Sequence, residues 1–263
     1  MNKAHSIAII SCFLVLCSFK DTGYRSHKIR TIVIDAGHGG HDPGNTGTKT
    51  RKQAEKDVAL SIALRLGEYI TLNIKDVRVI YTRDKDVFVE LRERAAIANR
   101  KNADFFLSIH CNSGNTTVSG TETFIMGLHK TQDNLEVSKR ENASILLEKD
   151  YIVNYEGYDP QSPEANIIFE MFQNSFQQQS LLLASKIENQ FKTRPKHRSR
   201  GVKQAGFLVL YKTAMPSILI ETGFLTNHEE EKYLHTPEGQ DFIAGSIFKA
   251  FRDYKSEIEA KAR

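Results

Sequence analysis

The fold of this chain is constrained most by short apolar segments that alternate with helical patterns. Between the first two segments, residues 55–70 place apolar side chains three or four positions apart, which predicts an amphipathic helix. Strand–helix–strand order favours parallel strand pairs covered by helices on both faces. We therefore expect one α/β domain with a mixed, twisted sheet whose strands include residues 31–35, 77–81, 105–109 and 217–221.

Further helices are expected over residues 91–99 and 239–254. A longer helix is predicted from Ser162, as its N-terminal cap with Pro163 in the first turn, to the Arg194-Pro195 pair that would end it. Its apolar stripe would consist of Ile168, Phe172, Phe176, Leu183, Ile187 and Phe191.

Residues 130–166 differ from their surroundings because they are polar. We expect a helix near residues 134–149 and a loop that continues to Asp159. This segment is interpreted as a helical insert within a single domain that spans residues 31–255, followed by a tail over 256–263.

The first 20 residues have the pattern of a secretory signal. Lys3 and His5 precede an apolar run over residues 7–16, which is too short to span a bilayer comfortably. We expect residues 1–20 to direct export across the inner membrane, most simply to the periplasm, with a linker over 21–30. Cys17 is a candidate for lipid attachment, and an uncleaved anchor or a buried helix are the alternatives.

Composition excludes several classes of protein. A hydrophobic content of 40% fits a packed core and excludes a disordered chain. Removal of residues 1–20 takes away Lys3 and Lys20 and no acidic residue, so the net charge of +4 falls to +2. Only Cys111 then remains as a cysteine, which excludes an internal disulfide.

The basic run over 192–200 could steer an acidic polymer, or it could be a solvated connection between a helix and a strand.

Polar residues with metal-binding or acid–base chemistry lie at the ends of the expected strands. His38 lies in a glycine-rich turn after the first strand, and small neighbours allow a histidine and a ligand to approach the backbone. His110 and Glu221 follow the third and fourth apolar segments, where a structural histidine and a solvated edge carboxylate are the common alternatives. Cys111 would point away from the face of His110.

Glu55 extends the buried face of the first helix at its N-terminal end. An inward carboxylate is costly unless it is paired or metal-bound, although a first-turn glutamate stabilised by the helix dipole is common. Ligand sites of open α/β sheets gather at the edge where these residues would meet. Two histidines and a glutamate form a catalytic zinc set, and a further glutamate can accept a proton from water, so the pattern predicts metal-assisted hydrolysis.

Five ordered motifs over roughly residues 30–254 resemble the zinc-dependent N-acetylmuramoyl-L-alanine amidases of the kind that separate daughter cells. They are the segments 31–44, 55–60, 82–84 with 91–94, 107–113 and 220–227. The resemblance implies a zinc exopeptidase-like fold and cleavage of the amide between N-acetylmuramic acid and L-alanine in peptidoglycan. It also implies that His38, Glu55 and His110 bind Zn²⁺ and that Glu221 is the catalytic glutamate. Residues 201–210 resemble a segment that lines the substrate groove.

Members of that family often carry a helix that plugs the zinc site until an activator protein displaces it. Residues 130–166 lie where this element belongs, and residues 140–144 resemble its helix. We expect Glu141 to occupy the open zinc position, and the alternative is a solvated helix whose glutamates never reach the metal.

Three rival functions remain to be tested. A zinc peptidase on the same fold is disfavoured by the order of the motifs, and a wall-binding module without activity is disfavoured by the complete set of ligands with Glu221. A nucleic-acid binder is disfavoured by the export signal and the near-neutral mature charge. We expect a peptidoglycan substrate, an activator protein, no nucleic acid and no membrane span in the mature chain.

Overall fold

The computed structural model describes residues 28–48, 54–162, 169, 175–193 and 198–261. One six-stranded sheet forms its centre, in the order β2-β1-β3-β6-β4-β5. Strands β2, β1, β3 and β6 are parallel, β4 runs antiparallel to β6, and β5 is parallel to β4, so the expected mixed sheet is confirmed. The strands are β1 Thr31–Ala36, β2 Arg78–Tyr81, β3 Phe105–Asn112, β4 Thr121–Met126, β5 Ser199–Ala205 and β6 Ser217–Phe224.

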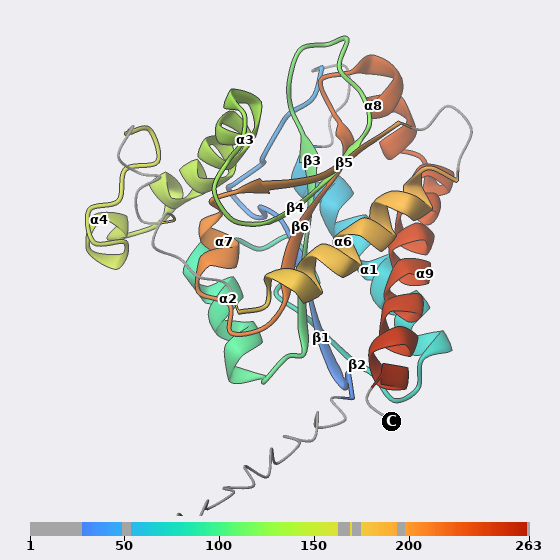
Figure 1. Cartoon of the computed structure of the whole chain (residues 1–263). Helices are drawn as coiled ribbons and strands as arrows, with labels where there is room; N and C mark the ends of the chain where they lie inside the picture. Colours follow the sequence, from blue (N-terminus) through green and yellow to red (C-terminus); the bar gives the residue numbers. More distant parts are fainter. Residues whose placement is uncertain (1–27, 49–53, 163–168, 170–174, 194–197, 262–263) are drawn as a thin grey trace, which may run out of the picture.

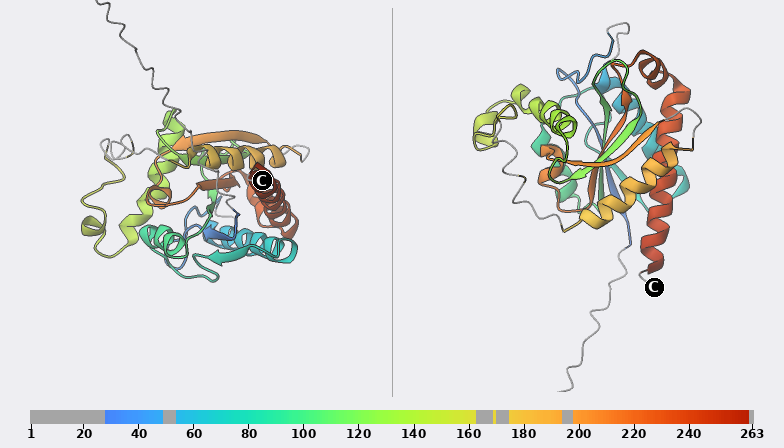
Figure 2. Two further views of the ribbon diagram at one scale, coloured as in Figure 1. Left: turned by 60° about the horizontal axis from the view of Figure 1, so that its bottom comes forward. Right: turned by 45° about the horizontal axis from the view of Figure 1, so that its top comes forward.

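Helices cover both faces of the sheet (Figures 1 and 2). One face packs against α1 (Glu55–Asn73), α6 (Gln177–Phe191) and α9 (Pro237–Lys261). The other face packs against α2 (Leu91–Arg100), α3 (Gln132–Asn142) and α7 (Leu208–Tyr211). The remaining elements are the 3-10 helix η1 (Ala143–Leu147), α4 (Tyr151–Asn154) and α8 (His228–Leu234).

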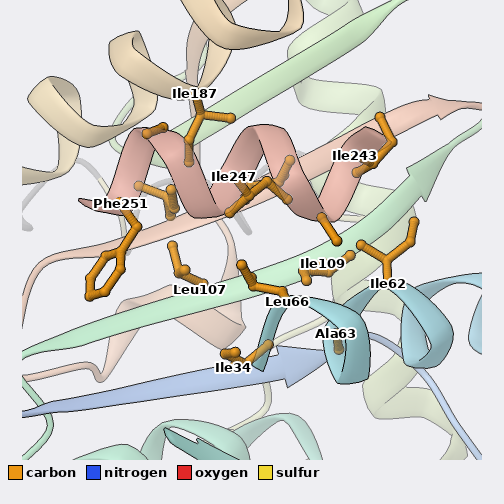
Figure 3. Close-up of a cluster of buried hydrophobic side chains, with 14 of the residues drawn as sticks. Ile34, Ile62, Ala63, Leu66, Leu107, Ile109, Ile187, Ile243, Ile247 and Phe251 are labelled. Atoms are coloured by element: carbon orange, nitrogen blue, oxygen red, sulfur yellow. The ribbon is translucent and has the colours of Figure 1, made fainter. Parts of the chain in front are cut away.

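Alternation along the strands divides the core into two layers. In β1, Ile32 and Ile34 face the layer of α1 and α9, whereas Val33 faces the layer of α2. Figure 3 shows the first layer, in which Ile62 and Leu66 of α1 lie beside side chains of β1, β3 and α9. Burial on both faces explains why β1, β3 and β6 each contain an unbroken run of three apolar residues.

The structure corrects several expected boundaries. Strand β3 continues three residues past the expected end at Ile109, so His110 lies within it. Strand β6 continues three residues past Glu221, which therefore lies inside the strand and not at its end. The helix expected over 134–149 ends at Asn142 and continues as η1, and the loop that follows contains α4. Helix α9 extends to Lys261, through most of the expected tail.

The long helix expected from Ser162 is wrong as a continuous element. Ser175 and Phe176 form a turn, and α6 begins only at Gln177. Leu183, Ile187 and Phe191 do face the core. Several predictions fall outside the described residues. They are the signal over 1–20 with Cys17, the linker positions 21–27, the first-turn Pro163, the stripe positions Ile168 and Phe172, and the Arg194-Pro195 end.

Strands β4 and β5 were not expected from the sequence.

Within the described part of the chain, no helix combines the length and the apolar character that a membrane crossing requires.

Candidate metal centre

The loop after β1 brings His38 to the carboxyl edge of the sheet. His38 itself has φ of 60°, and Gly39 and Gly40 that follow have φ of 126° and 60°. A side chain at Gly44 would collide with the His38 ring and the Glu55 carboxylate, and one at Gly37 would collide with the His110 ring. Glycines are therefore required at these positions, because they allow the imidazole rings and the Glu55 carboxylate to approach the backbone of the loop, as the glycine-rich turn around His38 predicted.

Two buried arginines fix the backbone of this loop. Arg94 donates from Nη1 to the carbonyl oxygen of Ala36 (2.7 Å) and from Nη2 to that of His38 (2.8 Å). Arg83 donates from Nε to the carbonyl of Ala36 (2.9 Å). Arg94 also pairs with the fully buried Asp35 at 2.8 Å. The arginines of the 82–84 and 91–94 motifs thus position His38, a role that the sequence did not reveal.

Glu55 is the first residue of α1 and is 1% exposed. Its Oε2 accepts a hydrogen bond from the backbone N–H of Asn45 (2.8 Å), and its Oε1 accepts one from the backbone N–H of Cys111 (2.9 Å). These two donors aim Oε1 at Nδ1 of His110, 3.1 Å away. The Cys111 side chain points away and contacts Thr222, as expected.

Four donor atoms converge beside the loop. Oε1 of Glu55 lies 3.2 Å from Nε2 of His38 and 3.1 Å from Nδ1 of His110. Oε2 of Glu141, from α3, lies 3.2 Å from the same nitrogen of His38 and 3.0 Å from that of His110. All four side chains are buried, and their ligand atoms lie within 4.8 Å of one another.

The donor set fits a zinc ion. Ligands about 2.1 Å from a tetrahedral zinc lie roughly 3.4 Å from one another, close to the separations of these donors. Nε2 of His38 and Oε2 of Glu141 are buried and have no hydrogen-bond partner among the described residues. Buried polar atoms normally have partners, and a cation between these two atoms would provide one for each.

Electrostatics support the same interpretation. Burial would lower the pKa of His38, but the carboxylates of Glu55, Asp42 and Glu141 outweigh it and raise that pKa well above its usual range. Burial likewise opposes the protonated form of His110, but Glu141 and Glu55 raise its pKa to about 9. A site that stabilises positive charge on both imidazoles also attracts a divalent cation, which binds their neutral forms.

Asp42 orients the His38 ring from behind. Its Oδ2 lies 2.9 Å from Nδ1 of His38, which leaves Nε2 free to face the other donors. The hydroxyl of Ser144, in η1, donates to the same carboxylate oxygen at 3.0 Å. A carboxylate on the outer nitrogen of a ligand histidine fixes its tautomer and raises its basicity. Neither residue was singled out in the sequence, where an aspartate four positions after His38 was the available signal.

Glu221 lies beside these donors on β6. Its Cα is the register partner of His110 on β3, so the two side chains share a face of the sheet. The carboxylate is fully buried, and neither oxygen has a hydrogen-bond partner among the described residues. Burial and the nearby Glu141 raise its pKa well above the usual range, although Arg140 opposes this shift. Glu221 is therefore not the solvated edge residue of the alternative interpretation.

The insert covers the site. A cavity of about 510 Å³ runs along His38 and Glu55 on one side and along Arg140, Glu141 and Ser144 on the other. Glu141 is 4% exposed, so the alternative of a solvated glutamate does not describe this structure.

Comparisons with known proteins point to one family. The family model described as N-acetylmuramoyl-L-alanine amidase (Amidase_3) matches residues 32–253. The amidase AmiA of Escherichia coli strain K12 is 33% identical over 238 residues, which cover 89% of this chain and 79% of AmiA. A solved amidase from Clostridium difficile 630 is 30% identical with a TM-score of 0.63, covering 87% of this chain and 97% of the other. The CwlD amidase, solved in complex with the GerS lipoprotein, is 27% identical with a TM-score of 0.62, covering 87% and 99%.

Proposed function

This chain belongs to the Amidase_3 family of N-acetylmuramoyl-L-alanine amidases, and we propose that it hydrolyses the amide between N-acetylmuramic acid and L-alanine in peptidoglycan with one zinc ion. The single observation that carries the proposal is the convergence of His38, Glu55 and His110 beside the buried Glu221. We further propose a role in wall turnover and in the separation of daughter cells, which membership in an amidase family supports.

The metal site would consist of Nε2 of His38, Oε1 of Glu55 and Nδ1 of His110, which is a set of three protein ligands with one position for water or substrate. A zinc ion bound there supplies Lewis acidity toward the lactyl carbonyl and lowers the pKa of water at the site. Asp42, Arg83 and Arg94 hold the His38 side of the site in place.

Glu221 is the proposed general base and acid. Its carboxylate accepts a proton from the attacking water, whose oxygen bonds to the lactyl carbonyl carbon. It then delivers that proton to the alanine nitrogen as the C–N bond breaks, which yields a lactyl carboxylate and a free amino group.

Glu141 is the proposed inhibitory ligand. Its position 3.0–3.2 Å from the ligand nitrogens of His38 and His110 would place its carboxylate where water or substrate has to bind. Removal of α3 from the site by an activator protein would open this position. The solved complex of CwlD with a lipoprotein supports the expectation of a protein partner in this family.

Export completes the proposal. We place the mature enzyme in the periplasm on the strength of the signal pattern in residues 1–20, with Cys17 as a candidate lipid anchor. Mass spectrometry of the mature N-terminus after expression in a Gram-negative host would distinguish a free, a lipidated and an uncleaved chain.

Metal analysis and digestion of sacculi test the function together. We expect about one zinc per mature chain, and release of free L-alanine amino termini and intact lactyl groups from purified sacculi. The His38→Ala variant should lose both. Release of fragments cut within the peptide would instead identify a peptidase, and absence of zinc from an active chain would contradict the metal centre.

A further inference from the structure

A bulge in β5 brings two basic side chains to one place. Thr121 of β4 pairs with Ser199, and Thr123 pairs with Val202, so two residues of β5, Arg200 and Gly201, lie opposite one residue of β4. In a regular strand, residues 200 and 203 would point to opposite faces of the sheet. The extra residue, at Gly201 with φ of 83°, allows Arg200 and Lys203 to reach the same side chain.

That side chain is Glu122, which is 2% exposed. Its Oε1 pairs with Nε of Arg200 and with Nζ of Lys203, and its Oε2 accepts a hydrogen bond from Asn112 (3.0 Å). Two cations therefore share one buried carboxylate. These three side chains together carry one surplus positive charge, and the carboxyl group of Glu230 also interacts with Arg200.

The group lies next to the proposed catalytic residue. Glu122 is the register partner of Glu221 on the neighbouring strand, so both side chains are on the same face. A cavity of about 250 Å³ opens beside it and is lined by Asn112, Arg200 and Phe224. The guanidinium of Arg200 lies over the Phe224 ring, 5.5 Å from its centroid, which stabilises the guanidinium in a single orientation.

The opposite wall of this cavity is the inhibitory helix. Asp133 and Glu136 of α3 line it, together with Arg140. The helix that places Glu141 among the metal ligands therefore also presents carboxylates to the cavity that contains Arg200.

We propose that Arg200, held by Glu122 and Phe224 and supported by Lys203, is an anion subsite that binds a carboxylate of the peptide part of the substrate. This inference rests on the proposed function. The amide linkage removes the charge of the lactyl group and the amino sugars are uncharged, so the anionic groups of the substrate are in its peptide. A guanidinium binds a carboxylate with two parallel hydrogen bonds, which favours a defined position over simple attraction.

The test compares two muramoyl peptides that differ at one group. One has a free carboxyl group on the residue after L-alanine, and in the other this carboxyl group is amidated. Hydrolysis of both is measured with the parent chain, Arg200→Gln, Arg200→Lys and the matched control Arg198→Gln, which removes the same charge from an exposed position two residues away. Each Arg200 and Arg198 variant is also made in a chain that carries Glu141→Gln, so that the inhibitory helix does not limit entry of the peptides into the site.

Arg200→Gln should lower kcat/KM for the acidic peptide about 10- to 30-fold, mostly through KM, because a charge-assisted hydrogen bond is lost. The amidated peptide should change by less than about threefold, since its neutral group makes no ionic bond. Arg200→Lys should recover part of the loss, and Arg198→Gln should have no effect. Equal losses for both peptides, or a loss in kcat alone, would overturn the subsite.

Calorimetric titration of the two peptides into the Glu221→Gln, Glu141→Gln chain, with and without Arg200→Gln, separates this subsite from the proposed reaction. Tighter binding of the acidic peptide that disappears with Arg200→Gln supports the subsite, whether or not the peptides are hydrolysed. Failure of every chain to hydrolyse either peptide would contradict the proposed function and leave the subsite supported. Equal binding of the two peptides contradicts the subsite even if hydrolysis is normal.

Discussion

The guanidinium of Arg140 lies 3.6 Å from the carboxylate of Glu221, although the two residues come from the insert and from the central strand β6. The same arginine donates from Nε to Oε1 of Glu141 at 3.0 Å. One turn of α3 therefore contacts both the proposed metal ligands and the proposed general base. Inhibition by this helix would therefore block the open metal position and the general base at the same time.

Replacement of Glu141 by glutamine should release activity. The neutral amide is a much weaker zinc ligand than the carboxylate and removes its attraction for His38 and His110. We expect basal hydrolysis of sacculi to rise about tenfold or more, which corresponds to loss of roughly 1.4 kcal/mol of helix binding. Dye release from labelled sacculi without any partner protein measures it.

Glu156→Gln is the matched control, because it removes a carboxylate from the same insert at an exposed position. Deletion of residues 132–158 should raise basal activity at least as much as Glu141→Gln. Unchanged basal activity in both Glu141→Gln and the deletion would rule out an inhibitory role for α3.

Glu221→Gln should separate metal binding from turnover. The variant keeps the size of the side chain, and Glu221 is not one of the three proposed ligands, so zinc content should stay near one per chain. Loss of the general base should lower kcat by about 10²- to 10⁴-fold. Metal analysis and single-substrate kinetics on the same preparation measure the two quantities. Hydrolysis near the parent rate would show that another group moves the proton.

The sequence predicted the central part of the fold because its signal is local. The apolar runs that became β1, β3 and β6 are buried on both faces, and such burial requires continuous apolar residues. Strand β5, with the sequence Ser-Arg-Gly-Val-Lys-Gln-Ala, is half-exposed and bulged, so neither alternation nor an apolar run marks it. Strand β4 begins with Thr-Glu-Thr and has only three apolar residues after them, and the partners of Glu122 come from β3 and β5.

The candidate ligands could be predicted because each interrupts an apolar pattern at a strand or helix end. The residues that position them could not, because their partners are distant in the chain. Arg94 bonds the carbonyl of His38 across 56 residues, and Ser144 bonds Asp42 across 102. Arg200 was interpreted as part of a basic run, and only the bulge of β5 shows that it pairs with Glu122.

Asp42→Ala should weaken metal binding without removal of a ligand. Without the carboxylate, the His38 ring loses the partner that fixes its tautomer, and zinc affinity should fall about 10- to 100-fold. Competition with a chromogenic chelator measures the affinity. Ser144→Ala is the matched control, because it removes only the hydroxyl that contacts Asp42 from the insert and should leave zinc affinity within about threefold. Equal affinities of Asp42→Ala and the parent would show that Asp42 does not orient His38.

Arg94→Met should destabilise the fold through Asp35. The two side chains are 2% and 0% exposed, and removal of the arginine leaves a buried carboxylate with only the hydroxyls of Thr82 and Ser108. Loss of one partner from a buried ion pair costs about 3–5 kcal/mol, whereas Ser108→Ala, which removes one hydroxyl, should cost about 1–2 kcal/mol. Urea unfolding followed by circular dichroism measures both.

The pH dependence of this loss identifies its cause. Burial opposes ionisation of Asp35, but Arg94 and the two hydroxyls outweigh it and hold the pKa of Asp35 below its usual value of 3.8. A carboxyl group whose folded-state pKa is depressed stabilises the fold above its unfolded pKa, and this contribution is lost as pH falls through the folded value. In Arg94→Met the pKa of Asp35 should rise, so the difference in unfolding free energy between parent and variant should be largest above the raised pKa of the variant and shrink as pH falls from there to the depressed pKa of the parent. A difference that does not vary with pH would show that Arg94 acts through packing and its backbone hydrogen bonds instead.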